Sequence, residues 1–211
     1  MNKIRFLVLL GFFTFTQIVS ACVDCHDIPL RFGISASLGF TQYSSAYKQD
    51  GNSTLGRLSL DTRYILSDFS SLALEVGIQN GNTMRLPISQ VELDELGGEP
   101  VTVSIKPSVD ALLAAYISPW DDSGFFAVVK GGIAYRQLQV DRNEVRDFAK
   151  TSPELQAGLG YFFNDNLGLH LLYEHIFGGN PNYQINRILQ TAAINNIPSQ
   201  NSLYLGITLL I

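Results

Sequence analysis

The sequence predicts an all-β protein, an eight-stranded antiparallel up-and-down transmembrane β-barrel. Three observations lead to this prediction. Apolar residues alternate with small or polar ones in eight stretches, and the connections between these stretches alternate between long and short. After residue 21 the longest unbroken apolar run, residues 111–117, is too short to cross a bilayer as a helix. Only helices and closed barrels satisfy every backbone group in lipid, so a membrane protein with this sequence must be a barrel.

The composition narrows the function classes without deciding between them. The 211 residues are 46% hydrophobic and 16% charged, with a formal net charge of −5. This hydrophobic content argues against a disordered chain, and the acidic balance argues against nucleic-acid binding, which requires a basic face. Whether the apolar residues form a soluble core or a lipid-facing surface depends on where they lie along each strand.

The first 21 residues have the organisation of a secretory signal peptide. Lys3 and Arg5 precede an apolar run from Phe6 to Phe15, and small residues end the segment at Ala21. We therefore expect cleavage near Ala21, a short periplasmic segment over residues 22–29, and a barrel over residues 30–211. Removing the two signal-peptide cations leaves 12 Lys and Arg against 19 Asp and Glu, a net charge of −7.

Eight stretches alternate with a period of two residues: 30–41, 57–64, 72–79, 108–117, 125–136, 154–163, 167–174 and 202–211. Alternation alone is also typical of a soluble sandwich or lipocalin. The polar face, however, consists mostly of Gly, Ser and Ala with isolated charges of both signs. Such a face suits the narrow interior of an eight-stranded barrel better than a solvent-facing sheet.

The connections follow the pattern of outer-membrane barrels, which have short periplasmic turns and long external loops. Short connections are expected at 66–71, 119–124 and 164–166, and long ones at 42–55, 88–100, 139–152 and 178–201. The apolar alternation continues through the even-numbered Met84, Leu86 and Ile88, and on the next strand the outward odd-numbered positions continue back through Val103 to Val101. We therefore expect one strand from Val101 to Ile117 and a projecting hairpin with its tip near residues 94–98. In the last loop, apolar residues at helical spacing allow either a short amphipathic helix or a collapsed loop over residues 185–193.

Aromatic residues gather at both ends of the expected strands, as interfacial girdles require. Near the short turns these are Tyr64, Phe69, Trp120, Phe125, Phe126, Tyr161 and Phe163, and near the long loops they are Phe40, Tyr43, Tyr135 and Phe177.

The later strands carry a family resemblance. The segments SPELQAGLGY (152–161), LHLLY (169–173) and LYLGI (203–207) resemble the last three strands of the transmembrane domain of outer membrane protein A. GGIAY (131–135) is similar to the fifth strand, and related barrels include the small opacity-type and virulence-associated surface proteins. The resemblance implies an eight-stranded barrel inserted by the outer-membrane assembly machinery. Two departures are the final residue, Ile211, where such barrels usually end in Phe, and the lack of a following peptidoglycan-binding domain.

Eleven charged or titratable residues fall on the inward face of the predicted strands. They form a candidate interior charge network: Arg31, Arg57, Asp61, Arg63, Glu75, Asp110, Lys130, Arg136, Glu154, His170 and Glu174. Such a network is either a polar conduit or a salt-bridged plug. We favour the plug, because an eight-stranded barrel leaves no room for an open channel and buried charges are structural when they are paired.

The sharpest local motif lies directly after the signal peptide, at Cys22-Val23-Asp24-Cys25-His26. Read literally, Cys-x-x-Cys-His is a haem c attachment signature. A segment just ahead of a barrel strand offers no haem pocket, however, and we rank haem below two alternatives. A disulfide or free pair of Cys22 and Cys25 in the oxidising periplasm comes first, and lipidation of Cys22 comes second. Two cysteines and one histidine are one ligand short of a structural zinc site. We thus expect no cofactor, no metal and no catalytic residue.

The expected function is a non-enzymatic one in the outer membrane of a Gram-negative bacterium, in envelope integrity and adhesion through the long loops. Expected partners are outer-membrane lipid and lipopolysaccharide, the assembly machinery, and a host or cell-surface ligand, but not nucleic acid. One alternative is a lipid A-modifying enzyme, for which outward-facing His175 lacks evident Ser and carboxylate partners. Another is a secreted lipocalin-like soluble barrel.

Overall fold

The computed structural model describes residues 30–44, 52–85, 90–95, 98, 101–118, 124–141, 145–181, 183–186 and 191–211. The expected signal peptide, the Cys22–His26 motif and Trp120 lie outside these residues. Within the described part of the chain, no helix is long and apolar enough to span a bilayer.

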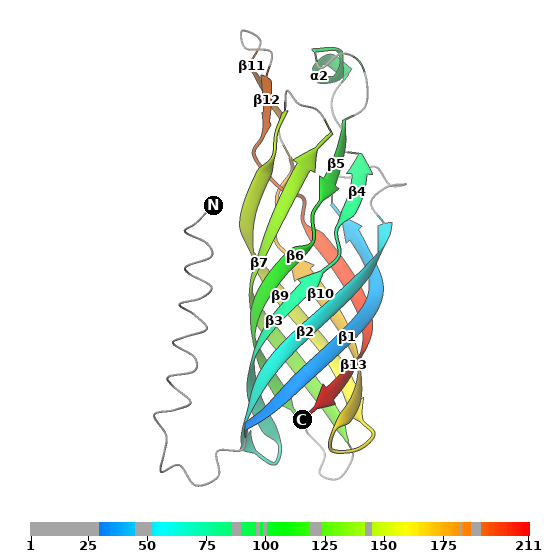
Figure 1. The fold of residues 1–211 in the computed structure, drawn as a ribbon, viewed down its shortest axis with the longest axis vertical. Coiled ribbons are helices and arrows are strands. Elements are labelled where there is room, and N and C mark those ends of the chain that lie inside the picture. Colours follow the sequence, from blue (N-terminus) through cyan, green and yellow to red (C-terminus); the bar gives the residue numbers. More distant parts are fainter. Residues whose placement is uncertain are drawn as a thin grey trace.

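Eight long strands form a closed antiparallel barrel (Figure 1), which confirms the predicted fold class. Around the barrel they are β1 (Leu30–Tyr43), β2 (Asn52–Ser67), β3 (Ser70–Gln79), β6 (Ser108–Ile117), β7 (Phe125–Val140), β9 (Phe148–Phe162), β10 (Leu167–Ile176) and β13 (Gln200–Leu210). Each pairs with the strands before and after it, and β1 pairs with β13 to close the wall. The closure extends to Phe32 and Ile211, whose backbones exchange hydrogen bonds of 3.1 and 2.8 Å.

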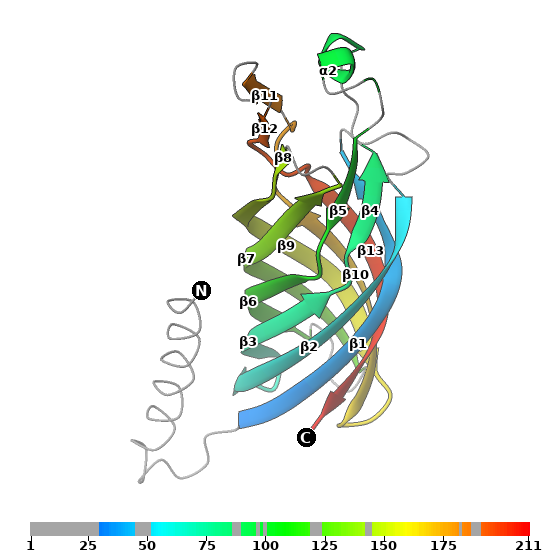
Figure 2. The same cartoon turned by 45° about the horizontal axis from the view of Figure 1, so that its top comes forward.

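The two ends of the barrel differ. At the turn end, β2 is joined to β3 and β9 to β10 by tight turns, and β13 ends there. At the loop end, the connections carry further structure (Figures 1 and 2), and these additional elements are β4 (Asn82–Arg85), α2 (Gln90–Glu95), β5 (Thr102–Ile105), β8 (Val145–Arg146), β11 (Tyr183–Asn186) and β12 (Thr191–Ile194).

The loops contain more strand than the sequence indicated. Residues 183–186 and 191–194 form the antiparallel pair β11–β12, with β8 added in parallel, so the described part of 185–193 is strand and neither the helix nor the collapsed loop. Ile185, Thr191 and Ile194 are β-branched, which favours strands, and the spacing of five apolar residues fits either structure. The strands also run further into the loops than expected: β1 ends at Tyr43, β2 starts at Asn52 and β9 starts at Phe148.

The outward faces of the barrel strands form an apolar belt. Leu38 is 70% exposed, Leu60 62% and Leu159 67%, and the alternate positions of the same strands are buried. Exposed leucines at this density are energetically favourable only against lipid, because each would cost free energy in water. The belt is therefore the membrane-facing surface of a transmembrane barrel.

Most of the expected girdle aromatics are exposed at the strand ends, but two point inward. Phe126 and Tyr43 are each only 4% exposed. Phe126 packs on Tyr116 and Phe162, with ring centroids 5.8 and 4.8 Å away. Both residues lie on the inward phase of their strands, and this phase decides their direction more strongly than aromatic character does.

A β-bulge interrupts the strand that was expected to run unbroken from Val101 to Ile117. Val109 faces Tyr135 of β7, whereas Ile105 faces Leu138, so Pro107 and Ser108 together oppose a single residue, Arg136. The extra residue reverses the facing of everything beyond it. Odd-numbered residues point outward in β6 and inward in β5.

The β4–β5 hairpin follows this reversal. Met84 pairs with Val103 in the same register that joins β3 to β6, and both side chains are buried. The bend brings Gly81 so close to Ile105 that a Cβ at residue 81 would collide with the Ile105 carbonyl. The hairpin side chains, together with neighbouring strands and the last loop, form an apolar loop-end cluster of Tyr43, Met84, Val101, Val103, Ile105, Leu138, Val140, Ile194 and Ile197.

Candidate functional site

The barrel interior holds ten of the eleven charged residues singled out in the sequence, each no more than 5% exposed; Arg31 alone is half-buried at the turn end. Four of them form a central ion-pair group: Arg57, Glu75, Asp110 and Lys130. The Arg57 guanidinium contacts Asp110 through Nη2–Oδ1 at 2.5 Å and Nε–Oδ2 at 3.2 Å, and it lies 2.7 Å from Glu75. Lys130 Nζ approaches the other Glu75 oxygen at 2.6 Å. The group joins β2, β3, β6 and β7 and contains equal numbers of both charges.

Glu174 is the centre of a second group, in which the partners are neutral. Its carboxylate accepts hydrogen bonds from Gln79, Gln156, Gln200, Ser202 and Tyr204, at donor–acceptor distances between 2.7 and 3.3 Å. Gln156 Nε2 also donates to Glu154 at 2.6 Å, so one amide connects the two carboxylates. This Glu174 group joins β3, β9, β10 and β13, and Ser202 extends it to Thr41 of β1. Together with the central ion-pair group it links all eight barrel strands.

Arg136 has a different role, because its hydrogen bonds go to the backbone of a loop. Its guanidinium donates to the carbonyls of Pro198 at 2.7 Å and Phe177 at 3.1 Å, and to Ser152 Oγ at 3.2 Å. Phe177 and Pro198 are the two ends of the connection between β10 and β13. Completely buried Arg136 thus holds this connection against the loop-end cluster.

The remaining inward charges have local partners. His170 lies between Ser37 at 3.0 Å and Thr208 at 3.1 Å. Asp61 and Arg63 approach to 3.7 Å, and the Arg63 guanidinium stacks 3.8 Å above the centre of the Tyr116 ring. Arg31 donates to the Asp165 carbonyl at the mouth of the turn end.

These contacts link strands across the barrel lumen. They do not bring a histidine and a carboxylate together as an acid–base pair. His170 bonds two hydroxyls and Glu174 bonds amides and hydroxyls, so the histidine and the carboxylate do not meet. Among the residues that the structure describes, no group of three or more His, Cys, Asp and Glu is placed to hold a metal ion. The Cys22, Cys25 and His26 motif falls outside those residues.

His175, the outward histidine considered for an enzyme, contacts Asn201 and Phe177 at the loop end. His175 Nδ1 and the Tyr173 hydroxyl both bond to Asn201 Oδ1, at 2.7 and 2.8 Å, and the His175 ring packs on Phe177. In the described part of the chain neither a serine nor a carboxylate hydrogen bonds to His175. These residues lie at the loop-end rim of the apolar belt.

Comparison with known proteins finds similarity in structure and not in sequence. No family model matches the chain, and no curated protein is detectably similar to it. A major outer membrane protein from Thermus thermophilus has a TM-score of 0.50 and 14% identity, covering 88% of this chain and all of that one. The attachment invasion locus protein of Yersinia pestis, in complex with the heparin analogue sucrose octasulfate, has a TM-score of 0.50 and 11% identity, covering 86% and 97%.

The protein is an eight-stranded outer-membrane-type β-barrel. At these identities the likeness establishes the fold alone. An outer membrane protease from Escherichia coli is also similar, with a TM-score of 0.44 and 8% identity, but a likeness at this level supports no enzymatic role.

The neutral half of the interior network was missed in the sequence. Gln79, Gln156, Ser202 and Tyr204 are all on the inward phase of their strands, which the alternation had placed correctly. A search restricted to charged residues passed over them, although a buried carboxylate needs several donors. The signal for these residues is available in the sequence. An inward glutamate without an inward cation nearby needs donors, and inward amides and hydroxyls on neighbouring strands are the candidates.

Proposed function

We propose that this barrel is a non-enzymatic protein of the Gram-negative outer membrane, with its loop end outside the cell, and that it stabilises the envelope and makes surface contacts. The asymmetry of the two ends carries the proposal. Tight turns close one end, whereas the other bears α2, the β4–β5 hairpin and the β8–β11–β12 sheet. Outer-membrane barrels place short turns in the periplasm and long loops outside.

The interior supports a mechanical role rather than transport. The charges that could line a conduit are paired or hydrogen-bonded across the lumen, and the loop-end cluster fills the interior above them. A rigid barrel of this kind is a platform that holds loops in a fixed arrangement. Loops on a rigid scaffold are where recognition commonly resides.

Fractionation and gel mobility test the location. We expect the protein in the outer-membrane fraction, and an unheated sample that migrates faster on an SDS gel than a heated one, because the closed barrel resists the detergent. Recovery in the soluble periplasm would contradict the membrane location.

A surface-binding assay tests the role of the loops. Cells displaying the protein are compared with cells in which residues 183–194 are replaced by a Gly/Ser linker, using adhesion to a heparin-coated surface and to a host-cell layer as readouts. Loss of adhesion in the linker variant, with Asp68→Asn at the turn end as an unchanged control, supports the proposal. Equal adhesion of all strains argues against a contact role for this loop.

The lipid A-modifying enzyme remains the second candidate, on the single observation that His175 is hydrogen-bonded at the outer rim. Lipid A mass spectra from deletion and overexpression strains distinguish it. A new or missing acyl group that follows the gene dosage and disappears in His175→Ala would replace the structural proposal.

A further inference from the structure

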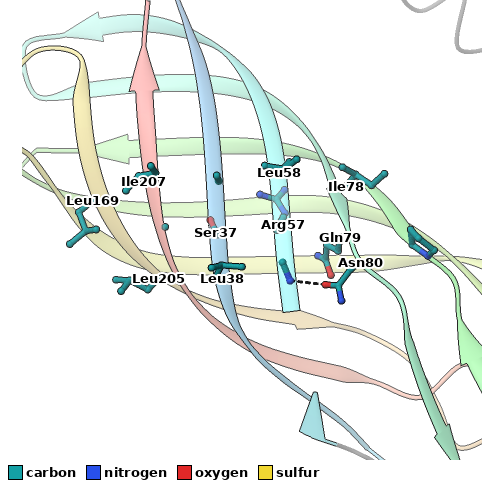
Figure 3. Close-up of a pocket in the computed structure, with 14 residues that line it drawn as sticks. Ser37, Leu38, Arg57, Leu58, Ile78, Gln79, Asn80, Leu169, Leu205 and Ile207 are labelled. Carbon is teal, nitrogen blue, oxygen red and sulfur yellow. Dashed lines mark hydrogen bonds between the residues drawn. The ribbon is translucent and has the colours of Figure 1, made fainter. Parts of the chain in front are cut away.

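A groove of about 870 Å³ opens in the outer wall of the barrel. Figure 3 shows it from the side of β13, β1, β2 and β3, with leucine and isoleucine side chains standing along its course. The volume lies within the range of about 300–1,000 Å³ that is usual for small-molecule sites. It is the outward, lipid-facing side chains that give the groove its apolar walls: Leu38, Leu58, Ile78, Leu169, Leu205 and Ile207.

Two small residues explain why the wall is hollow there. Ala36 lies between its cross-strand partners Leu58 and Ile207, and Gly56 is paired with Leu38. Ala36 presents only a methyl group to the outside and Gly56 presents no side chain, whereas the residues paired with them are leucine and isoleucine. The floor of the groove is thus formed by Ala36 and Gly56, and its sides by the residues paired with them.

The groove leads to a notch where the barrel wall stops being continuous. Pairing between β2 and β3 ends at Arg57 and Gln79, and beyond Asn80 the β4–β5 hairpin is joined to the barrel through β7 and not through β2. The Asn80 side chain covers the freed edge of β2, accepting from Gly56 N at 2.6 Å and donating to the Thr54 carbonyl at 3.4 Å. Asn80 and Pro107 form the loop-end limit of the groove.

We propose that this groove is a binding site for one acyl chain of lipid A, the membrane anchor of lipopolysaccharide. The inference rests on the proposed orientation, which places the loop end of the belt in the outer leaflet. The groove is continuous with the lipid-facing surface, so hydrocarbon is what surrounds it, and its apolar walls offer a chain more contact than a flat wall does.

Charge favours a lipid with an anionic head group. Lys106 is exposed and directly precedes Pro107 at the loop-end limit of the groove. Exposed acidic side chains at the loop end, among them Asp94, Glu95 and Asp141, are not part of the groove lining, so Lys106 is the exposed charge that directly adjoins it among the described residues. A chain in the groove would place a phosphate of its head group at the level of Lys106, where a cation attracts it.

Native mass spectrometry of the full barrel released from nanodiscs tests the site, with purified lipid A and phosphatidylglycerol supplied together. The wild type should retain lipid A in preference to phosphatidylglycerol. Ala36→Leu and Gly56→Leu fill the floor and should lower lipid A retention about tenfold. Their matched controls are Ala111→Leu and Gly131→Leu, which add the same side chain to outward positions of β6 and β7, and these should retain lipid A as the wild type does.

Photo-crosslinking gives a second measurement that does not depend on filling the groove. A benzophenone amino acid at Leu58, in the groove wall, should capture lipid A more than one at Leu113 on β6, although both leucines are 59% exposed. Lys106→Gln should lower retention by about threefold.

The proposal is overturned if the groove-filling variants and their controls retain equal amounts of lipid A while all four show the heat-dependent gel shift of a folded barrel. Equal retention of phosphatidylglycerol by the wild type would also overturn it, because the groove would then be an ordinary part of the belt. Unchanged retention in Lys106→Gln would overturn the head-group contact. None of these readouts depends on adhesion, so the site and the proposed surface role fail separately.

Discussion

The barrel contains two interiors, and they differ in character. Between the turn end and the bulge, the interior holds the central ion-pair group and the Glu174 group, together with an aromatic cluster of Tyr116, Phe126 and Phe162. Beyond the bulge, it is built from the loop-end cluster, in which Val103 and Leu138 are completely buried. The outward faces change at the same level, since Thr83 and Ser104 there carry hydroxyls 3.2 Å apart on the outer side.

The difference teaches that the interior side chains of a barrel segment depend on whether lipid or water lies outside the same segment. Where the outside is lipid, the strands turn apolar side chains outward, and the inside carries polar and charged groups that pair with one another beside the aromatic residues Tyr116, Phe126 and Phe162. Where the outside is water, the arrangement returns to that of a soluble protein, with apolar residues inside. Because the bulge inserts one residue, the odd-numbered apolar side chains face the membrane in β6 and the interior in β5.

Deletion of Pro107 tests what sets the facing of the hairpin. Without the extra residue, β5 continues β6 as a regular strand while Ile105 still lies opposite Leu138, so Val103, Ile105 and Met84 should stay inward. In a Cys22→Ser/Cys25→Ser background, a Val103→Cys reporter should be unreactive towards a water-soluble maleimide both before and after the deletion. A reporter that becomes reactive after the deletion would show that the bulge itself, and not the register against β7, keeps these side chains inside.

Arg57→Met tests the polar interior and should destabilise the barrel by about 3–5 kcal/mol, because the Asp110 carboxylate is left buried without a cation. Guanidinium unfolding in lipid vesicles, followed through the single tryptophan, Trp120, measures the change. Adding Asp110→Leu should recover a large part of the loss. A single variant as stable as the wild type would mean that the central ion-pair group contributes little.

Arg136→Met tests the junction of the two interiors and should have the smallest global effect. It removes the donors to Phe177 and Pro198, at a cost of about 1–3 kcal/mol. The loss should be local, so limited proteolysis between β10 and β13 should accelerate while the heat-dependent gel shift persists. Lys150→Met, which removes one bond to Asn196 in the same connection, is the milder control. Unfolding of the whole barrel would show that the two interiors are not separable.

The period-two alternation predicted the eight strands, the fold class and the inward direction of residues such as Arg57 and Glu174. This was possible because facing in a strand depends on parity alone, and parity can be counted from the sequence. The strand ends were less accurate, since β1 and β2 continue pairing beyond the apolar belt, where polar residues such as Gln42 and Asn52 give no alternation to read.

The bulge could not be predicted by counting alternate residues along the sequence. Counting through Lys106 and Pro107 assigned Val103 to the outer face, and only the register against β7 shows that one residue is inserted there. Which inward residues meet across the lumen also depends on the stagger of distant strands. Glu174 and Gln79 are 95 positions apart in the sequence, yet Gln79 Nε2 donates to Glu174 Oε2 at 2.7 Å. The parity count gave each its direction but not its partner.

The pairing of β1 with β13 also constrains how this chain reaches its folded state. Gly33 and Leu210 are neighbours in the closed wall although 177 positions separate them, and a contact of that separation is slow to form. Until it forms, both of these strands have open hydrogen-bonding edges and a row of exposed leucines, which are features that promote aggregation. A chaperone that binds extended segments in transit, and a catalyst that holds the first strand until the final one arrives, would each shorten this vulnerable period.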